Sequence, residues 1–275
     1  MNKLVLAHSE TMRVLVLTLT ASLLLPQATR SFTPSLAPLT TNSFHKSIKP
    51  HRLSAMVNDE HQPYPSLLVY DMDACLWDKE MFEMPAIPTS ANVVLGDLNG
   101  RGTGVTGVMS GRNKISLHAG SLLSLQEYAD GLYPKMKLAF ASSADTPFAE
   151  KVGRASLALL EVLPGLTVWD LVVEQCWDGV DVNQIGRQPP LSSNKARSHF
   201  PRLKEATAIR YDEMLFFDDC LWGDHCGIVS RECREEDTDL GPAVLRTPNG
   251  LGVKEWKKGL EEYEKQAKKL QSKVN

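Results

Sequence analysis

The sequence predicts an α/β fold in which a parallel sheet is covered by helices on both faces. Three observations support this prediction: short apolar runs of strand length recur along the chain, longer amphipathic segments separate them, and acidic residues directly follow two of the runs. A helix between two strands returns the chain to the same end of the sheet, so the strands become parallel. The 275 residues are enough for one such domain and a tail.

The predicted elements alternate in the order β-α-β-α-β-α-β. Strands are expected at five apolar runs, namely Ser66–Tyr70, Lys137–Ala141, Thr167–Val173, Met214–Phe217 and Ala243–Arg246. Helices are expected at four longer segments, namely Ser121–Asp130, Phe148–Leu163, Lys195–Thr207 and Val253–Lys273. The last of these is rich in Lys and Glu, which is typical of a solvated helix face.

A glycine-rich segment, residues 99–120, predicts a β-hairpin inserted between the first strand and the first helix. Short β-prone pieces flank a central Ser110–Asn113 turn. A phosphate-binding loop is the alternative, but the G-K-[ST] ending of a P-loop is absent. We therefore expect a small β-hairpin cap insert at about residues 78–120, which is too short for a full cap domain.

The first sixty residues have the composition of a cleavable targeting leader. Val14–Leu25 is a twelve-residue apolar run behind two basic residues, a length typical of a signal-peptide core and short for a membrane span. Thr29–Val57 lacks acidic residues, as transit peptides do. This bipartite leader resembles plastid presequences of algae with secondary plastids, while secretion and mitochondrial import remain alternatives. The folded domain is expected at residues 61–275, without a stable membrane span.

Charge and cysteine content exclude some classes of partner. Residues 1–58 hold six Lys/Arg and one acidic residue, which leaves 24 basic and 32 acidic side chains for the rest. An acidic domain lacks the clustered positive charge that nucleic-acid binding requires. The cysteines lack paired zinc-knuckle spacing, so unligated thiols are preferred over a zinc site; they are Cys75, Cys176, Cys220, Cys226 and Cys233.

Acidic residues at the end of the first strand are the first candidates for chemistry. Asp71 and Asp73 follow Ser66–Tyr70, and ligand sites of open α/β sheets lie at the carboxyl ends of the strands. Two carboxylates at this spacing suit a nucleophile and an acid/base, together with a hard cation such as Mg²⁺. A solvated turn is the alternative for an isolated D-x-D.

Three further positions supply what phosphoryl transfer requires. Ser142 follows the second strand, Lys195 opens the third predicted helix, and the pair Asp218 and Asp219 follows the strand at Met214–Phe217. Each has an ordinary structural alternative, as a strand-end cap, a surface lysine or a helix N-cap. Their joint occurrence in one chain favours a common site.

These segments resemble the four motifs of the haloacid dehalogenase superfamily, and within it the eukaryotic magnesium-dependent phosphatases. In chain order they are L-V-Y-D-M-D-A-C-L-W, A-F-A-S-S, S-N-K-A-R-S-H-F-P-R-L and M-L-F-F-D-D. The resemblance covers the chain from about Pro65 to the last helix. It implies a Rossmann-like three-layer sandwich and hydrolysis of phosphate monoesters through an aspartyl-phosphate, with phosphotyrosine proteins or sugar phosphates as substrates.

The resemblance also implies a role for each matched residue. Asp71 would be the nucleophile and a Mg²⁺ ligand, and Asp73 would protonate the leaving oxygen, activate water and offer its backbone carbonyl to the metal. Ser142 and Lys195 would bind the phosphate, Lys195 also holding the nucleophile, and Asp219 would complete the metal site.

Five other residues are assigned supporting roles or mark departures. Asp218 and Asp224 are expected around the metal ligands, and Trp77 is expected at the substrate mouth or, alternatively, in the core. Ser143 is expected to contact substrate, although the phosphatase branch usually carries arginine there. Cys75 stands where the superfamily usually has threonine.

The two departures, Cys75 and Ser143, motivate a second hypothesis, a catalytically weak relative that binds a phosphorylated ligand or protein. In a phospho-accepting receiver domain, the phosphoacceptor lies on a later strand than the acidic pair. Here the D-x-D pair comes first and the F-F-D-D pair comes last, which disfavours a receiver domain. Other reactions on the same scaffold, such as mutase or dehalogenase chemistry, are disfavoured because the insert is small.

Overall fold

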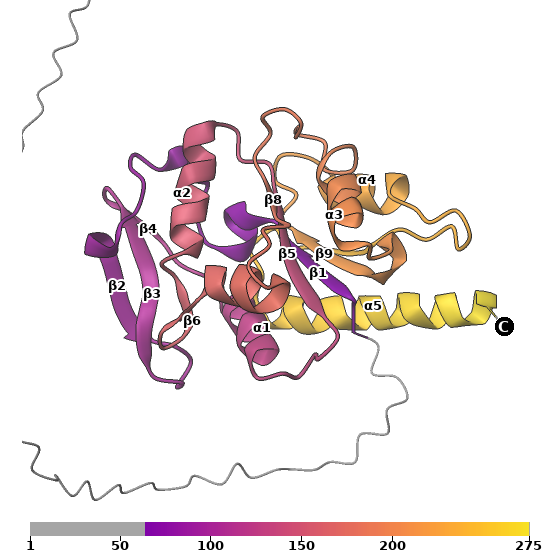
Figure 1. Cartoon of the computed structure of the whole chain (residues 1–275), viewed down its shortest axis with the longest axis horizontal. Helices are drawn as coiled ribbons and strands as arrows, with labels where there is room; N and C mark the ends of the chain where they lie inside the picture. The colour runs from indigo at the N-terminus through magenta and orange to yellow at the C-terminus, as the bar shows by residue number, and fades with distance from the viewer. Residues whose placement is uncertain (1–63, 275) are drawn as a thin grey trace, which may run out of the picture. The chain divides into compact units, whose positions relative to one another are not determined.

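A five-stranded parallel sheet carries the candidate site (Figure 1), and the computed structural model describes residues 64–274. The leader expected at residues 1–60 lies outside the described residues. In spatial order the strands are β10 (Ala243–Arg246), β9 (Met214–Asp218), β1 (Leu67–Tyr70), β5 (Lys137–Ser142) and β8 (Gln184–Ile185). The central strand β1 pairs on both sides, because Leu67 lies opposite Lys137 of β5 and Met214 of β9.

Two helix layers cover the sheet, which confirms the predicted three-layer α/β sandwich. Leu68 and Tyr70 of β1 pack on one side with α1 (Ala119–Ala129), α2 (Pro147–Leu157) and α5 (Val253–Val274). Leu67 and Val69 pack on the other with α3 (His199–Thr207) and α4 (His225–Glu232). Successive side chains of a strand point to opposite faces, so a strand buried on both sides is continuously apolar.

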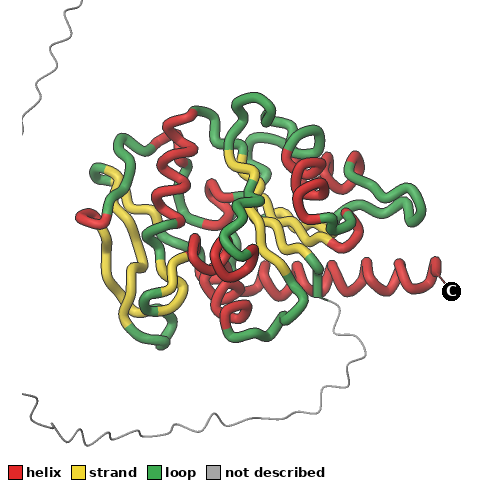
Figure 2. The backbone as a smooth tube through the Cα atoms, viewed as in Figure 1, coloured by secondary structure: helices red, strands yellow, loops and turns green. Residues whose placement is uncertain are grey.

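The glycine-rich segment forms an antiparallel sheet outside the main sheet (Figure 2). Its strands are β2 (Val93–Asp97), β3 (Thr103–Ser110) and β4 (Asn113–Ile115). The expected hairpin is β3 and β4, which turn at Gly111 and pair Ser110 with Asn113. Trp77 and Leu117 form an antiparallel bridge where the insert leaves and rejoins the core. The insert also contains strand β2, for which no strand was expected from the sequence.

The strand predicted at Thr167–Val173 is wrong, because most of this segment is helical. Only β7 (Leu166–Thr167) is extended, and a helical turn, η4 (Asp170–Gln175), follows it. The Thr167 side chain accepts a hydrogen bond from the Asp170 N–H at 3.0 Å, and the Asp170 carboxylate accepts the Thr167 N–H at 3.4 Å. This reciprocal capping stabilises the start of a helix in a segment whose apolar composition alone predicts a strand.

The helix predicted at Phe148–Leu163 ends early, at Leu157, because a second hairpin follows it. Strand β6 (Glu161–Leu163) pairs with β7 around a Pro164–Gly165 turn, where Gly165 has a φ of 78° that suits glycine. The helix predicted from Lys195 begins four residues later, at His199, and Lys195 lies in the preceding turn.

Short helical turns complete the described chain: η1 (Met72–Leu76), η2 (Met81–Glu83), η3 (Ser90–Asn92) and η5 (Tyr211–Glu213). The long α5 has the charged character expected for a solvated face. Among residues 64–274, no helix is both long enough and apolar enough to span a membrane.

Candidate active site

The carboxyl ends of three parallel strands bring the predicted acidic and hydroxyl groups to one edge of the sheet. Asp71 follows β1, Ser142 ends β5 and Asp218 ends β9. The Asp71 N–H donates to the Phe217 carbonyl at 2.8 Å, which extends the pairing of β1 and β9 by one residue. Asp71, Ser142 and Asp218 are almost fully buried, so the strands hold their side chains in a low-dielectric setting.

Lys195 connects two of these carboxylates. Its Nζ lies 2.7 Å from Asp71 Oδ1 and 2.6 Å from Asp218 Oδ2, and its side chain is 1% exposed. Although burial opposes it, these two neighbours raise the pKa of Lys195 above its ordinary value. A buried ion pair of this geometry keeps the ammonium group charged beside Asp71.

The same contacts separate the pKa values of Asp71 and Asp218. Burial raises the pKa of Asp71, with Lys195 opposing the shift and Asp218 adding to it. Burial also disfavours charge on Asp218, but Lys195 and His225 outweigh it and lower its pKa. Asp218 Oδ1 also accepts a hydrogen bond from the Cys220 N–H at 2.8 Å. Its Oδ2 lies 3.2 Å from His225 Nδ1.

Three carboxylates form a cluster suited to a hard cation. Asp71, Asp218 and Asp219 each offer an oxygen, and these atoms lie within 4.8 Å of one another. Burial, followed by the charge of Asp218, raises the pKa of Asp219. Crowded buried carboxylates repel each other unless positive charge is shared among them, and oxygen is the donor that Mg²⁺ prefers. The donor set therefore fits Mg²⁺.

Asp73 lies in the η1 turn, and its carboxylate is held apart from this cluster. Its Oδ1 accepts hydrogen bonds from Trp77 Nε1 at 3.2 Å and from the Met81 N–H at 3.0 Å. Burial, with a smaller contribution from Glu80, raises the pKa of Asp73 to about 7. A carboxyl group with this pKa can hold a proton at neutral pH, as an acid catalyst must.

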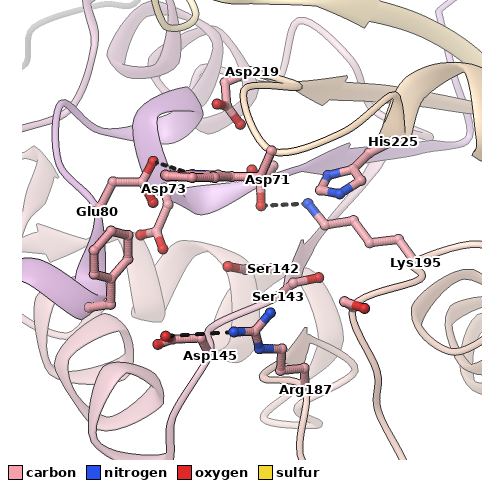
Figure 3. A pocket seen from close by; sticks show the side chains of 13 residues that line it. Asp71, Asp73, Glu80, Ser142, Ser143, Asp145, Arg187, Lys195, Asp219 and His225 are labelled. Atoms are coloured by element: carbon pink, nitrogen blue, oxygen red, sulfur yellow. Dashed lines mark hydrogen bonds and ion pairs between the residues drawn. The ribbon is translucent and has the colours of Figure 1, made fainter.

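These side chains face a cavity of about 530 Å³ (Figure 3). Figure 3 shows Asp71 and Lys195 pointing toward one another, Ser142 and Ser143 below them in this view, and Arg187 with Asp145 below the two serines. The cavity is lined by Asp71, Asp73, Glu80, Phe82, Ser142, Ser143, Asp145, Arg187, Ser193, Lys195, Asp219, Trp222 and His225. Most of the predicted site residues therefore meet in one place.

The rim of the cavity contains two exposed aromatic rings. Trp222 is 74% exposed, and its Nε1 donates to Glu80 Oε1 at 3.1 Å. The ring of Phe82 packs edge-on against Trp222, with centroids 6.3 Å apart. These contacts join the segment after the first motif to the loop after β9 and place aromatic rings at the rim of the cavity.

Three sequence-predicted residues lie elsewhere. Trp77 is fully buried in the core and reaches the site only through its hydrogen bond to Asp73. Asp224 is half-exposed and caps α4, accepting the Gly227 N–H at 3.0 Å. The Cys75 sulfur accepts a hydrogen bond from Thr247 Oγ1 at 3.3 Å, a contact that does not involve Asp73.

Several cavity residues were absent from the sequence analysis. Glu80, Asp145 and Arg187 come from loops and His225 begins α4, and only tertiary folding brings them to the cavity. His199, which contacts the backbone of the cavity residue Ser142, belongs to the third motif. Its Nε2 lies 3.0 Å from the carbonyl oxygens of Ser142 and Gly186, and burial lowers its pKa to about 4.

Comparison with known proteins agrees with this geometry. Residues 63–266 match the model of a family described as Acid Phosphatase, which is of the haloacid dehalogenase type. A search of the curated proteins finds no match to the chain. The family match covers the sheet, the insert and every cavity residue named above. The chain therefore belongs to the Acid Phosphatase family, and the expected relationship to the phosphatases of the haloacid dehalogenase superfamily is confirmed.

Proposed function

We propose that this protein is a magnesium-dependent phosphatase that hydrolyses phosphate monoesters through an aspartyl-phosphate on Asp71. The observation that carries the proposal is the position of Lys195, whose ammonium lies 2.7 Å from Asp71 within a cluster of three buried carboxylates. Lys195 orients Asp71 and offers positive charge to an incoming phosphate. Ser142, across the cavity, is the proposed hydroxyl partner of the phosphoryl group.

In the first step, an Asp71 carboxylate oxygen attacks phosphorus, and the bond from phosphorus to the leaving oxygen breaks. Asp73, as a carboxylic acid, gives its proton to that oxygen. In the second step, Asp73 takes a proton from water, whose oxygen attacks phosphorus and displaces Asp71 as a carboxylate. Inorganic phosphate leaves, and Asp73 is again protonated for the next cycle. Its separation from the carboxylate cluster supports this second role.

The proposed Mg²⁺ ligands are the carboxylates of Asp71 and Asp219 and the backbone carbonyl of Asp73, with Asp218 supporting the cluster. Bound there, Mg²⁺ would supply positive charge that neutralises the repulsion between these carboxylates and a phosphate group. Lys195 contributes to the same neutralisation from its own position.

The proposed substrates are a phosphotyrosine protein or a sugar phosphate. A small insert rather than a full cap domain supports an accessible site, and the exposed Trp222 and Phe82 at the rim offer apolar contact to a leaving group. The combination suits a phosphate presented on a larger molecule.

Hydrolysis of p-nitrophenyl phosphate by the full chain, with Mg²⁺ or with EDTA, tests the proposal. Asp71→Asn should abolish turnover, while Asp97→Asn, at an exposed position on β2, should leave it unchanged. Turnover by Asp71→Asn comparable to that of the unchanged chain would refute the nucleophile assignment. Equal rates with Mg²⁺ and EDTA would refute the metal dependence.

The variant Asp73→Asn separates the two steps. Because p-nitrophenolate leaves without a proton, the first step should proceed and the second should stall. We expect one burst of product per enzyme molecule and a phosphoryl adduct on Asp71 detectable by mass spectrometry. Continued steady turnover without a burst would argue against the two-step role of Asp73.

We also propose that residues 1–60 direct the chain to an organelle, a plastid being favoured by the signal-plus-transit composition. A fluorescent fusion of residues 1–60 tests this, and a fluorescence pattern confined to the cytosol would refute it.

A further inference from the structure

The candidate cavity contains more negative than positive charge, which a phosphate ester would have to overcome. Its acidic side chains are Asp71, Asp73, Glu80, Asp145 and Asp219. Among the described residues, Lys195 and Arg187 are the Lys and Arg side chains that line it. Lys195 is already held between two carboxylates at 2.6 and 2.7 Å. Besides the proposed Mg²⁺, a dianionic group would therefore gain from a cationic side chain whose N–H donors are not already paired.

Arg187 has such donors. Its ion pair with Asp145 spans 3.6 Å, longer than a hydrogen bond, and its side chain is 42% exposed. Within residues 64–274 the structure gives its guanidinium no closer partner. In the view of Figure 3 this group lies with Asp145 beyond Ser142 and Ser143 from Asp71 and Lys195, and all of these residues line the same cavity. Several guanidinium N–H groups are consequently available to a ligand.

Two neighbouring polar atoms also need a partner. Ser143 Oγ and Asp145 Oδ1 are inaccessible to solvent and have no hydrogen-bond partner among the described residues. A buried polar atom without a partner costs about 1–3 kcal/mol, so a polar ligand at this wall would recover part of that cost. Ser143 lines the cavity, so rotation of its side chain about the Cα–Cβ bond would let the hydroxyl donate to an anionic oxygen, and Asp145 can hold the Arg187 guanidinium beside it.

The backbone carries Arg187 to this wall in a fixed position. The Gly186 N–H donates to the Ser142 carbonyl at 2.8 Å, and buried His199 contacts the carbonyl oxygens of both residues at 3.0 Å. Gly186 has a φ of 123°, which favours glycine at this turn. Gln188 Nε2 donates to the Asp145 carbonyl at 3.3 Å. The loop is thus tied on both sides of Arg187, which reduces the ordering cost of binding.

We propose that Arg187, together with Ser143, binds the transferring phosphoryl group on the side opposite Lys195. The inference rests on the proposed phosphatase function and adds a substrate-binding residue from outside the four motifs. Guanidinium groups bind phosphate through paired, charge-assisted N–H···O bonds, which matches the donors left available here. Arg187 would act in binding both substrate and transition state, while Asp71 and Asp73 perform the chemistry.

The test is binding of inorganic phosphate to the full chain in the presence of Mg²⁺, measured by isothermal titration calorimetry. Arg187→Gln should weaken binding by about 10- to 100-fold, the range expected for a charge-assisted hydrogen bond. Arg187→Lys should lose less phosphate affinity, since lysine retains the positive charge but not the paired N–H donors of the guanidinium group. Arg202→Gln is the matched control, because Arg202 is an exposed arginine on α3 whose hydrogen bond within residues 64–274 goes to Gln184; this variant should bind phosphate as the unchanged chain does.

Kinetics with p-nitrophenyl phosphate provide a second readout. For Arg187→Gln we expect KM to rise by a similar factor with kcat largely retained, because the lost contact is made in the ground state as well. If the unchanged chain binds phosphate but does not hydrolyse p-nitrophenyl phosphate, the proposed function is refuted. The phosphate affinities of the Arg187 variants still test the inference in that case. Phosphate affinity of Arg187→Gln within about twofold of the unchanged chain, or no phosphate binding by the unchanged chain, would overturn the inference. Should Arg187→Gln lack a cooperative thermal transition, Arg187→Lys decides by the same two measurements.

Discussion

Acidification should destabilise the fold through His199, a buried residue that ties the third motif to the second. Its Nδ1 lies 2.9 Å from Ser198 Oγ, and its Nε2 contacts two carbonyl oxygens, so a neutral ring with its proton on Nε2 donates to the carbonyls and can accept from the Ser198 hydroxyl. Burial, with help from the charge of Lys195, lowers the pKa of His199 from 6.5 to about 4. Protonation would put a second proton on Nδ1, the nitrogen that accepts the hydrogen bond from the Ser198 hydroxyl.

The magnitude follows from linkage between protonation and folding. In the unfolded chain His199 takes up a proton near pH 6.5, whereas the folded chain resists until about pH 4, so stability is lost as the pH falls between these values. The shift predicts that His199 alone costs about 2 kcal/mol of unfolding free energy at about pH 5, and about 3 kcal/mol at about pH 4.

Urea unfolding of the full chain and of His199→Gln, at about pH 7 and about pH 5, measures this contribution. The variant will be less stable at neutral pH, because it loses part of the network. The stability difference between the two proteins should narrow by about 2 kcal/mol on acidification, since carboxylates titrate in both proteins and cancel. A difference that stays constant within about 0.5 kcal/mol would refute the argument for a buried neutral imidazole.

Three further predictions concern packing, the buried ion pair and the cavity rim. Gly120→Ala should lower the unfolding free energy by about 1–3 kcal/mol in urea titrations, because the added Cβ would overlap the Gly252 carbonyl oxygen. An unchanged unfolding midpoint would contradict the packing of α1. Lys195→Met should cost about 3–5 kcal/mol by the same measurement, because it leaves two buried carboxylates without their cation, and a neutral effect would refute the ion pair. Trp222→Phe should change the unfolding free energy by less than about 0.5 kcal/mol. It should nevertheless raise KM for aryl phosphates, because it removes the hydrogen bond to Glu80 at the rim of the cavity. An unchanged KM would show that the rim does not contact the substrate.

The parts of the fold that could be predicted are those with a strong local cause. Strands β1, β5 and β9 are buried on both faces, so each appears in the sequence as a continuous apolar run, and their ends locate Asp71, Ser142 and Asp218. Parallel pairing then brings those ends to one edge without further information.

Errors arose where a local capping interaction or a short strand decided the structure. Thr167 and Asp170 cap a helix within a run that has strand composition. Strand β8 has only two residues, and its pairing with β5 at Ser142 is what defines it. An apolar run of this length is compatible with either structure until the caps and neighbours are known.

The sequence by itself determined the α/β class, the strand ends that carry the acids, and the lysine that accompanies them, because each depends on a pattern within a few residues. Only the tertiary structure decided that Arg187, Glu80 and His225 share the cavity and that Trp77 lies in the core. Those positions depend on how segments far apart in the sequence pack and form hydrogen bonds across the whole domain. A loop residue has no periodic pattern that would reveal its spatial neighbours.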